Sequence, residues 1–268
     1  MFAKILIANR GEIACRIMRG CKALGIPTVA IYAAADAEAL HRETADEAFE
    51  VKAPAGREAD AIAPYLNIDE VIRVAKEAGC DAAHPGYGFL AESEAFAAAC
   101  ASNGVKFVGP ESRTIGLFGD KTEARALAIK HGVSVAAGSG AIKTAEEAIK
   151  FVEDNKVPYP VLVKAAFGGG GRGQRLVHEP SELAASLDSC VKEATMAFGD
   201  GTCFIEEFVS PGRHIEIQVL GDGPGGNAVH FFERDCSVQL RNQKVKLQHG
   251  EGFNESLGFV GGGDCTSA

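Results

Sequence analysis

The first strand-to-helix unit of the chain reads Lys4-Ile5-Leu6-Ile7-Ala8-Asn9-Arg10-Gly11-Glu12-Ile13-Ala14. Its apolar start is typical of a buried strand. Apolar residues then recur at helical spacing from Glu12 to Leu24, and Gly25 ends the predicted helix. A buried strand followed at once by an amphipathic helix is the building unit of a parallel sheet that helices cover.

The same alternation continues over the first part of the chain. Further strands are predicted at residues 28–32, 81–83 and 106–108, and further helices at residues 68–78 and 93–101. We therefore expect an α/β, Rossmann-like N-terminal domain with a mostly parallel sheet.

Ligands of such sheets bind at the carboxyl ends of the strands, where two glycine-containing segments follow predicted strands. Residues 8–14 resemble a phosphate-binding turn, but with one glycine a structural turn is the simpler explanation. Residues 84–90, His-Pro-Gly-Tyr-Gly-Phe-Leu, are suited to form a rigid wall of a site, and they indicate no catalytic role by themselves.

A region of different character begins at Asp120, the first residue of an expected helix cap. A second capping sequence begins at Thr144 and precedes a helix to about Asp154. The remaining pattern is antiparallel α+β: a strand at 160–164, a helix at 181–197, and strands at 202–208, 214–220 and 227–233. The turn at residues 221–226 is expected to join the last two strands as a hairpin. We expect an N-terminal domain over residues 1–119, a second and incomplete domain over 120–245, and a divergent flexible tail over 246–268.

Composition narrows the class of protein. The 268 residues are 46% hydrophobic and carry a net charge of −9, which disfavours whole-chain disorder and a general nucleic-acid binder. No apolar run is long enough for a membrane span, and the eight cysteines form no C-x-x-C pair. We expect reduced, mostly buried cysteines and, because no signal or transit segment precedes the first strand, a cytoplasmic protein.

The strongest local signal is a glycine run at residues 168–171, which comes three residues after the predicted strand that ends at Lys164. Adjacent glycines contribute no packing, but their bare amide groups can close over a phosphate. Lys164 and Arg172 would place cations beside the same oxygens. The alternative is a flexible loop, and the run is neither a Walker motif nor a G-x-G-x-x-G turn.

Two carboxylates, Glu206 and Glu207, lie inside the apolar strand pattern Phe204 to Val209. Alternation would turn one of them toward the core, where an unpaired charge is costly. The strand could line an adenine pocket. Equally, it could be an ordinary pleat with one solvated glutamate and one ion pair.

Polar residues alternate along the segments 213–218 and 233–239, as on a ligand-facing sheet or on any solvent face. A short basic cluster follows at Arg241, Lys244 and Lys246. It is either a solvated face or an anion-binding wall.

Taken together, these segments resemble the biotin carboxylase component of biotin-dependent carboxylases, an ATP-grasp family of ligases. The similarity is collinear from Met1 to about Val245, and its motifs are residues 7–14, 84–90, 119–121, 164–173, 211–220 and 233–245. Within the family the pyruvate carboxylase branch is most similar, on residues 40–42, 45–49, 123–129 and 165–167. The stretches 84–90 and 233–245 argue against other ATP-grasp ligases, such as carbamoyl-phosphate or peptide ligases.

The resemblance implies a two-step reaction: ATP and bicarbonate give carboxyphosphate, and the carboxyl group then passes to biotin carried on a lysine. By motif, Lys121 and Lys164 would contact ATP phosphates, with Gly170 and Gly171 in the loop that closes over them. The adenine strand would be Glu206, Glu207, Phe208 and Val209. His214 and Gln239 would contact the nucleotide, and Lys244 would help to hold bicarbonate as the catalytic residue.

The resemblance also implies Mg²⁺ or Mn²⁺, a biotin carboxyl carrier domain as partner, and a homo-oligomer in the full-length protein; a mitochondrial address also occurs in the family. Two departures stand out. Asn242 occupies a position where many members have histidine, and residues 246–268 contain no counterpart of the family's metal, bicarbonate and biotin residues. We therefore expect no turnover from the chain as written. The alternatives are a non-catalytic nucleotide-binding fragment and a biotin carboxylase of an acyl-CoA carboxylase.

Overall fold

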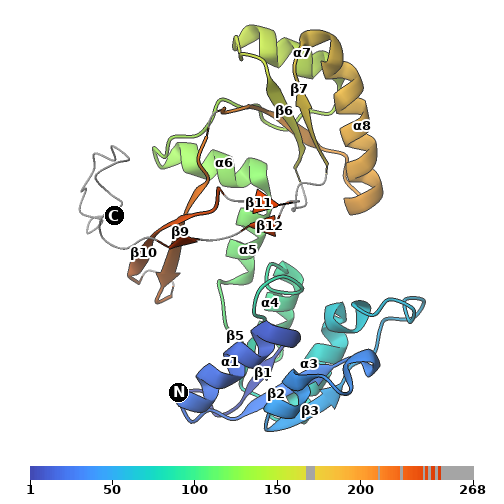
Figure 1. Ribbon diagram of the computed structural model, residues 1–268, viewed down its shortest axis with the longest axis vertical. Helices are drawn as coiled ribbons and strands as arrows, with labels where there is room; N and C mark the ends of the chain where they lie inside the picture. Colours follow the sequence, from blue (N-terminus) through green and yellow to red (C-terminus); the bar gives the residue numbers. More distant parts are fainter. Residues whose placement is uncertain are drawn as a thin grey trace. The chain divides into compact units, whose positions relative to one another are not determined.

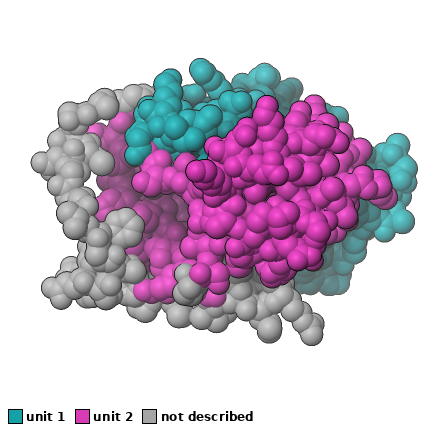
Figure 2. Space-filling model, turned by 90° about the horizontal axis from the view of Figure 1, so that it is seen from above, with its two compact units in different colours: residues 1–132 teal, residues 133–268 magenta. Residues whose placement is uncertain are grey.

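The computed structural model describes residues 1–166, 173–210, 212–223 and 226–237, and the backbone of residues 239–240, 243–244 and 247–248. The chain divides into two compact units, Met1–Gly132 and Val133–Ala268, which are coloured separately in Figure 2. Each unit is described by itself below, with the element labels of Figure 1.

The first unit is built on a five-stranded parallel sheet with the order β3-β2-β1-β4-β5. Its strands are β1 (Ile5–Ile7), β2 (Thr28–Tyr32), β3 (Glu47–Glu50), β4 (Ala82–His84) and β5 (Lys106–Phe107). The order runs outward from β1 in both directions, as in Rossmann-like sheets, and this confirms the predicted class.

Helices cover both faces of this sheet. On one face, α1 (Gly11–Ala23) packs Ile17 and Met18 against Ile5 and Ile7 of β1. On the other face, α3 (Ile68–Glu77) and α4 (Glu94–Ser102) pack against Leu6 and the side chains beside it. For this reason β1 and β2 are buried on both sides. The remaining helices of this unit are α2 (Leu40–Thr44), α5 (Ser112–Gly119) and α6 (Lys121–Lys130), with 3-10 turns at Ala34–Asp36 and Ala63–Leu66.

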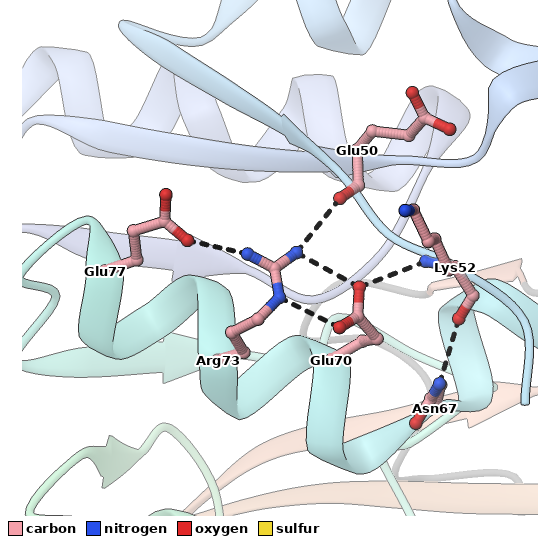
Figure 3. A network of polar contacts seen from close by, with 6 residues as sticks. All are labelled: Glu50, Lys52, Asn67, Glu70, Arg73 and Glu77. Atoms are coloured by element: carbon pink, nitrogen blue, oxygen red, sulfur yellow. Dashed lines mark hydrogen bonds and ion pairs between the residues drawn. The ribbon is translucent and has the colours of Figure 1, made fainter.

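Strand β3 was not predicted from the sequence, because glutamates stand at both of its ends and neither of its middle residues is fully buried. An exposed network ties its end to α3 (Figure 3). Arg73 contacts Glu70 at 2.8 Å and Glu77 at 2.6 Å, and it donates to the Glu50 carbonyl at 3.3 Å. Such exposed pairs contribute little stability individually, and here they fix the position of an edge strand.

The described part of the second unit contains three sheets. The first has the order β7-β6-β8 and is antiparallel, and its strands are β6 (Val161–Ala165), β7 (Gln174–Val177) and β8 (Cys203–Glu207). The second has the order β13-β10-β9, with β9 (Ile215–Gly221), β10 (Ala228–Asp235) and β13 (Leu247–Gln248). β11 (Gln239–Leu240) pairs with β12 (Gln243–Lys244). The predicted hairpin of the second sheet is confirmed as β9–β10, whereas β7 was missed.

Helices α7 (Ala145–Asp154) and α8 (Pro180–Phe198) cover one face of the sheet β7-β6-β8. Val152 of α7 and Leu187 of α8 share an apolar cluster with Val161, Val163 and Ile205. The expected capping box at Thr144 is present in full, with Glu147 as its reciprocal partner. Asp120 caps α6 by accepting from the amides of Thr122 at 2.8 Å and Glu123 at 3.3 Å.

A buried polar cluster joins three elements of the first unit around Asp36. Its carboxylate accepts hydrogen bonds from the Arg10 guanidinium, one of them at 2.7 Å from Nε, and from the Tyr65 hydroxyl at 2.5 Å. The same hydroxyl accepts from the Ala33 amide at 3.0 Å. The Arg10 hydrogen bonds hold the pKa of Asp36 below its ordinary value, against the opposing effect of burial.

Replacing Asp36 with Asn should lower the free energy of unfolding by about 1–3 kcal/mol at neutral pH, because Arg10 and Tyr65 would lose a charged acceptor. Since the folded pKa is lowered, the carboxylate stabilises above its unfolded pKa of about 3.9 and this contribution is lost as the pH falls through the folded value. The difference between wild type and variant should therefore shrink in acid. Denaturant unfolding from pH 3 to 7 tests this, with the exposed Glu38→Gln as control; a difference that stays constant would contradict it.

Candidate functional site

Lys164 lies on the face of the sheet β7-β6-β8 that is opposite the helices; we call this the Lys164 face. On β6, Val161, Val163 and Ala165 are buried toward α7 and α8, so Leu162 and Lys164 point to the other side. Lys164 pairs in register with Gln174 of β7 on one side and with Phe204 of β8 on the other. The cation therefore stands on the central strand, between two neighbours.

Glu206 shares the Lys164 face, and its carboxylate meets Lys164 Nζ at 2.5 Å. The two side chains are 28% and 23% exposed, so the pair is largely withdrawn from water. Glu207 is the next residue and pairs with Val161, so alternation turns it to the helix-covered side at the strand end. The sequence pattern allowed an ordinary pleated strand in which one glutamate forms an ion pair, and Glu206 does form one. The pair also places a carboxylate beside Lys164, the cation proposed to contact phosphate.

Strand β8 is held on its far edge by the segment before α7. The Ser139 amide donates to the Ile205 carbonyl at 2.8 Å, and the Ile205 amide donates to Ser139 Oγ at 2.8 Å. Ile142 exchanges backbone hydrogen bonds with Cys203, and the Glu207 amide donates to the Ala137 carbonyl. Because of these bonds, β8 has backbone hydrogen-bond partners on both of its edges although it is the last strand of its sheet. Nothing in the sequence identified Ser139, since its partner lies 66 residues away.

The chain leaves the ladder after Glu207. The Phe208 amide donates to the Pro160 carbonyl at 3.3 Å, and Phe208 and Val209 are 37% and 62% exposed. Backbone groups and apolar side chains at the end of a strand are what a flat base such as adenine requires. The geometry is compatible with the adenine strand that the sequence suggested.

His214 lies just before β9, which belongs to the sheet β13-β10-β9, whereas Lys164 and Glu206 lie in the sheet β7-β6-β8. Its amide donates to Ser237 Oγ at 2.9 Å, and its carbonyl accepts from the Cys236 amide at 2.7 Å. Beside it, Arg213 and Asp235 form an ion pair of 2.8 Å. The Arg213 hydrogen bond, together with two from Ser237, holds the pKa of Asp235 well below its usual range.

The other predicted residues are placed as follows. Lys121 is the first residue of α6 and belongs to the first unit. Gln239 begins β11 and Lys244 ends β12, where the two residues are paired in register. Gly170 and Gly171 lie outside the described residues, in the connection between β6 and β7.

The structure brings together the two segments of the first unit that the sequence singled out. The Ala8 amide donates to the His84 carbonyl at 2.9 Å, and Asn9 Nδ2 donates to the carbonyls of Pro85 at 2.7 Å and Tyr87 at 2.9 Å. Gly86 has φ +66°, and a Cβ there would lie 2.9 Å from Asn9 Nδ2. Only glycine fits this approach.

A pocket of about 300 Å³ opens at this junction, at the carboxyl ends of β1 and β4. It is lined by Asn9, Arg10, Glu12, Ile13, Tyr87, Gly88 and Phe89. Burial lowers the pKa of His84 and so favours its neutral imidazole, whose Nδ1 accepts from the Gly86 amide at 3.1 Å. The junction of β1 and β4 is the position at which Rossmann-like sheets bind ligands.

The described part of the chain contains neither a cluster of metal-binding side chains nor a membrane-spanning helix. There, no three His, Cys, Asp or Glu side chains are placed to hold a metal ion. None of the helices described above is long and apolar enough to cross a membrane. The seven cysteines among the described residues are buried and form no disulfide with one another.

From its hydrogen bonds with Ile205, we expect Ser139 to contribute measurably to the free energy of unfolding. Ser139→Ala should lower the free energy of unfolding by about 1–3 kcal/mol, because the buried Ile205 amide would lose its acceptor. Denaturant unfolding checks this. The exposed Ser181→Ala, near the start of α8, is the matched control and should change stability by less than about 0.5 kcal/mol. Equal effects of the two substitutions would show that Ser139 does not hold β8.

Comparison with known families divides the chain into two matched domains. Residues 1–115 match the biotin carboxylase N-terminal domain, and residues 120–248 match the ATP-binding domain of the carbamoyl-phosphate synthase L chain. The chain thus consists of a biotin carboxylase N-terminal domain followed by part of an ATP-grasp domain. The paired charges on β6 and β8 lie in the second of these domains.

Curated relatives are carboxylases. Mitochondrial pyruvate carboxylase of Rattus norvegicus is 49% identical over 243 residues, which cover 90% of this chain and 20% of the relative. The 2-oxoglutarate carboxylase small subunit of Hydrogenobacter thermophilus is 45% identical over 246 residues, which cover 91% of this chain and 50% of the relative. The chain therefore spans a fifth to a half of the length of these relatives.

The solved structures that resemble this chain are also carboxylases. The biotin carboxylase domain dimer of Hydrogenobacter thermophilus 2-oxoglutarate carboxylase, in complex with MgADP, ADP and bicarbonate, has a TM-score of 0.85 at 45% identity, covering 91% of this chain and 52% of that one. Rhizobium etli pyruvate carboxylase with acetyl coenzyme A has a TM-score of 0.82 at 48% identity, covering 91% and 21%. The chain belongs to the biotin carboxylase family of biotin-dependent carboxylases.

Proposed function

We propose that this chain binds ATP on the Lys164 face and supplies the nucleotide-binding part of a biotin carboxylase. The observation that carries the proposal is the Lys164–Glu206 pair, which holds a lysine ammonium on the central strand between β7 and β8. The match of residues 120–248 to an ATP-binding domain supports it, as does the similarity to a biotin carboxylase domain solved with MgADP.

In the proposed binding mode, ATP phosphates take the place of the Glu206 carboxylate as the anionic partner of Lys164. Lys121 is a second phosphate contact, and Gly170 and Gly171 supply backbone amides. The adenine lies against Glu206 to Val209, with His214 and Gln239 as further nucleotide contacts. Cations and fixed amides suit a reaction in which negative charge develops on transferred phosphate oxygens.

The reaction that we propose for the longer protein has two steps. Bicarbonate attacks the γ-phosphorus of ATP, giving carboxyphosphate and ADP. The carboxyl group then passes to N1 of biotin, where the new N–C bond replaces the N–H bond, and phosphate leaves with the proton. Lys244 would help to hold the bicarbonate anion, and the biotin would be presented by a carboxyl carrier domain in a homo-oligomer.

The described residues do not form a site for Mg²⁺ or Mn²⁺, and we assign no step of the reaction to a metal held by them. A second candidate, nucleotide binding without turnover, is favoured by the same observation. Bicarbonate-dependent release of phosphate from ATP in the presence of free biotin separates the two. Release above background would support turnover by this chain, and binding without release would support the second candidate.

Lys164→Met should weaken the binding of ATP by roughly 10- to 100-fold, because a charge-assisted contact with phosphate is removed. The affinity for adenosine, which has no phosphate, should change much less. Titration calorimetry with both ligands measures this. Lys192→Met is the matched control, because Lys192 is an exposed lysine of α8 paired with Asp188. A wild-type chain that binds no ATP, or a Lys164 variant that binds it normally, would overturn the proposed function.

A further inference from the structure

We propose that Glu193 of α8 is a positioning residue for the phosphate end of the nucleotide site. The inference rests on the proposed function and extends it to a side chain on the helix-covered side of the sheet. The observation behind it is a set of hydrogen bonds that converge on Gly173, the residue that immediately precedes β7.

Gly173 is held through both of its backbone groups. Its amide donates to Glu193 Oε1 at 3.2 Å. Its carbonyl accepts from the Ala165 amide at 2.7 Å and from the Cys190 thiol at 2.8 Å. Cys190 and Glu193 lie three residues apart on α8 and therefore share one face of the helix. Two side chains of α8 thus fix one peptide position.

The conformation of Gly173 makes this position specific. Its φ is +65°, and a Cβ there would lie 3.0 Å from the Ala165 Cβ. A larger residue would be strained in both respects. The close approach brings the start of β7 against the end of β6, so Ala165 and Gly173 define where the connection between the two strands begins and ends.

Glu193 has a second partner on the same strand. Its Oε2 meets Arg175 Nη2 at 2.7 Å, with the two side chains 36% and 41% exposed. Arg175 pairs with Val163, so it points toward the helices, while the preceding residue Gln174 pairs with Lys164 on the opposite face. One carboxylate therefore holds both residues that flank Gln174.

This arrangement links α8 to the proposed phosphate cation. Gln174 is in register with Lys164, and its backbone position is set by its two neighbours, Gly173 and Arg175. Without the carboxylate, the end of the β6–β7 ladder at Lys164 loses the two contacts with Glu193 and keeps the hydrogen bond from the Cys190 thiol. Glu193 acts through this ladder and does not touch the nucleotide. Its loss should therefore affect ligands that carry phosphates and spare the adenine end on β8.

The test is titration calorimetry of the full chain with ATP and adenosine, using Glu193→Ala and Glu193→Gln. We expect Glu193→Ala to weaken ATP binding roughly tenfold, because small displacements of binding groups are costly, and to change adenosine binding by less than about twofold. Glu193→Gln should have a smaller effect, because its amide oxygen can still accept from Gly173. If the alanine variant does not fold, Glu193→Gln alone tests the inference.

Asp188→Asn is the control on the same helix, because Asp188 forms only the exposed pair with Lys192 among the contacts described for it. It should leave both affinities unchanged. An equal loss for ATP and adenosine in the Glu193 variants would indicate a merely structural role and overturn the inference, as would unchanged ATP affinity. A wild-type chain that binds no ATP overturns the proposed function instead, and the inference with it.

Discussion

The ion pair between Lys164 and Glu206 is the interaction on which the proposed nucleotide site of the second unit depends. It joins the central strand β6 to β8 on the face opposite the helices. A lysine that is only 28% exposed needs a partner, because a largely desolvated charge is costly when it is left alone. Glu206 supplies that partner here, and an anionic ligand can supply it instead. The same pair therefore stabilises the sheet and provides a position for a phosphate.

One face of the sheet β7-β6-β8 packs against helices, and the other face carries the charged pair. Val161, Val163 and Ile205 pack with α7 and α8 into one apolar cluster, which fixes the strands in space. Because side chains alternate along a strand, this packing also determines that Lys164 and Glu206 point to the other side. Glu193 and Ser139 add hydrogen bonds at opposite edges of the same three strands. The charged pair is thus held by a framework that contains no part of the proposed ligand contacts.

The elements that were predicted correctly from the sequence are those whose structure is determined by neighbouring residues in the chain. The strand-to-helix unit of β1 and α1, the hairpin β9–β10 and the capping box at Thr144 all depend on residues close together in the chain. Strands β3 and β7 were missed because each has exposed polar residues and is defined by its neighbours in the sheet. Resemblance to a family supplied the roles proposed for Lys121, Lys244 and His214, which residue spacing alone did not indicate.

The parts of the candidate site that were missed depend on partners far away in the sequence. Asn9 was noted as part of a turn, but its acceptors at Pro85 and Tyr87 lie 76 and 78 residues further along. Ser139 and Glu193 gave no signal, because a serine between glycines and a glutamate on a helix are usually solvated. Their importance comes from what the fold places beside them.

The most direct measurement of the central claim is hydrogen–deuterium exchange of the full chain with and without ATP. If ATP binds on the Lys164 face, amide exchange should slow in residues 161–166 and 203–209, and less in the first unit. Unchanged exchange in these two segments at saturating ATP, or protection confined to the first unit, would contradict the account.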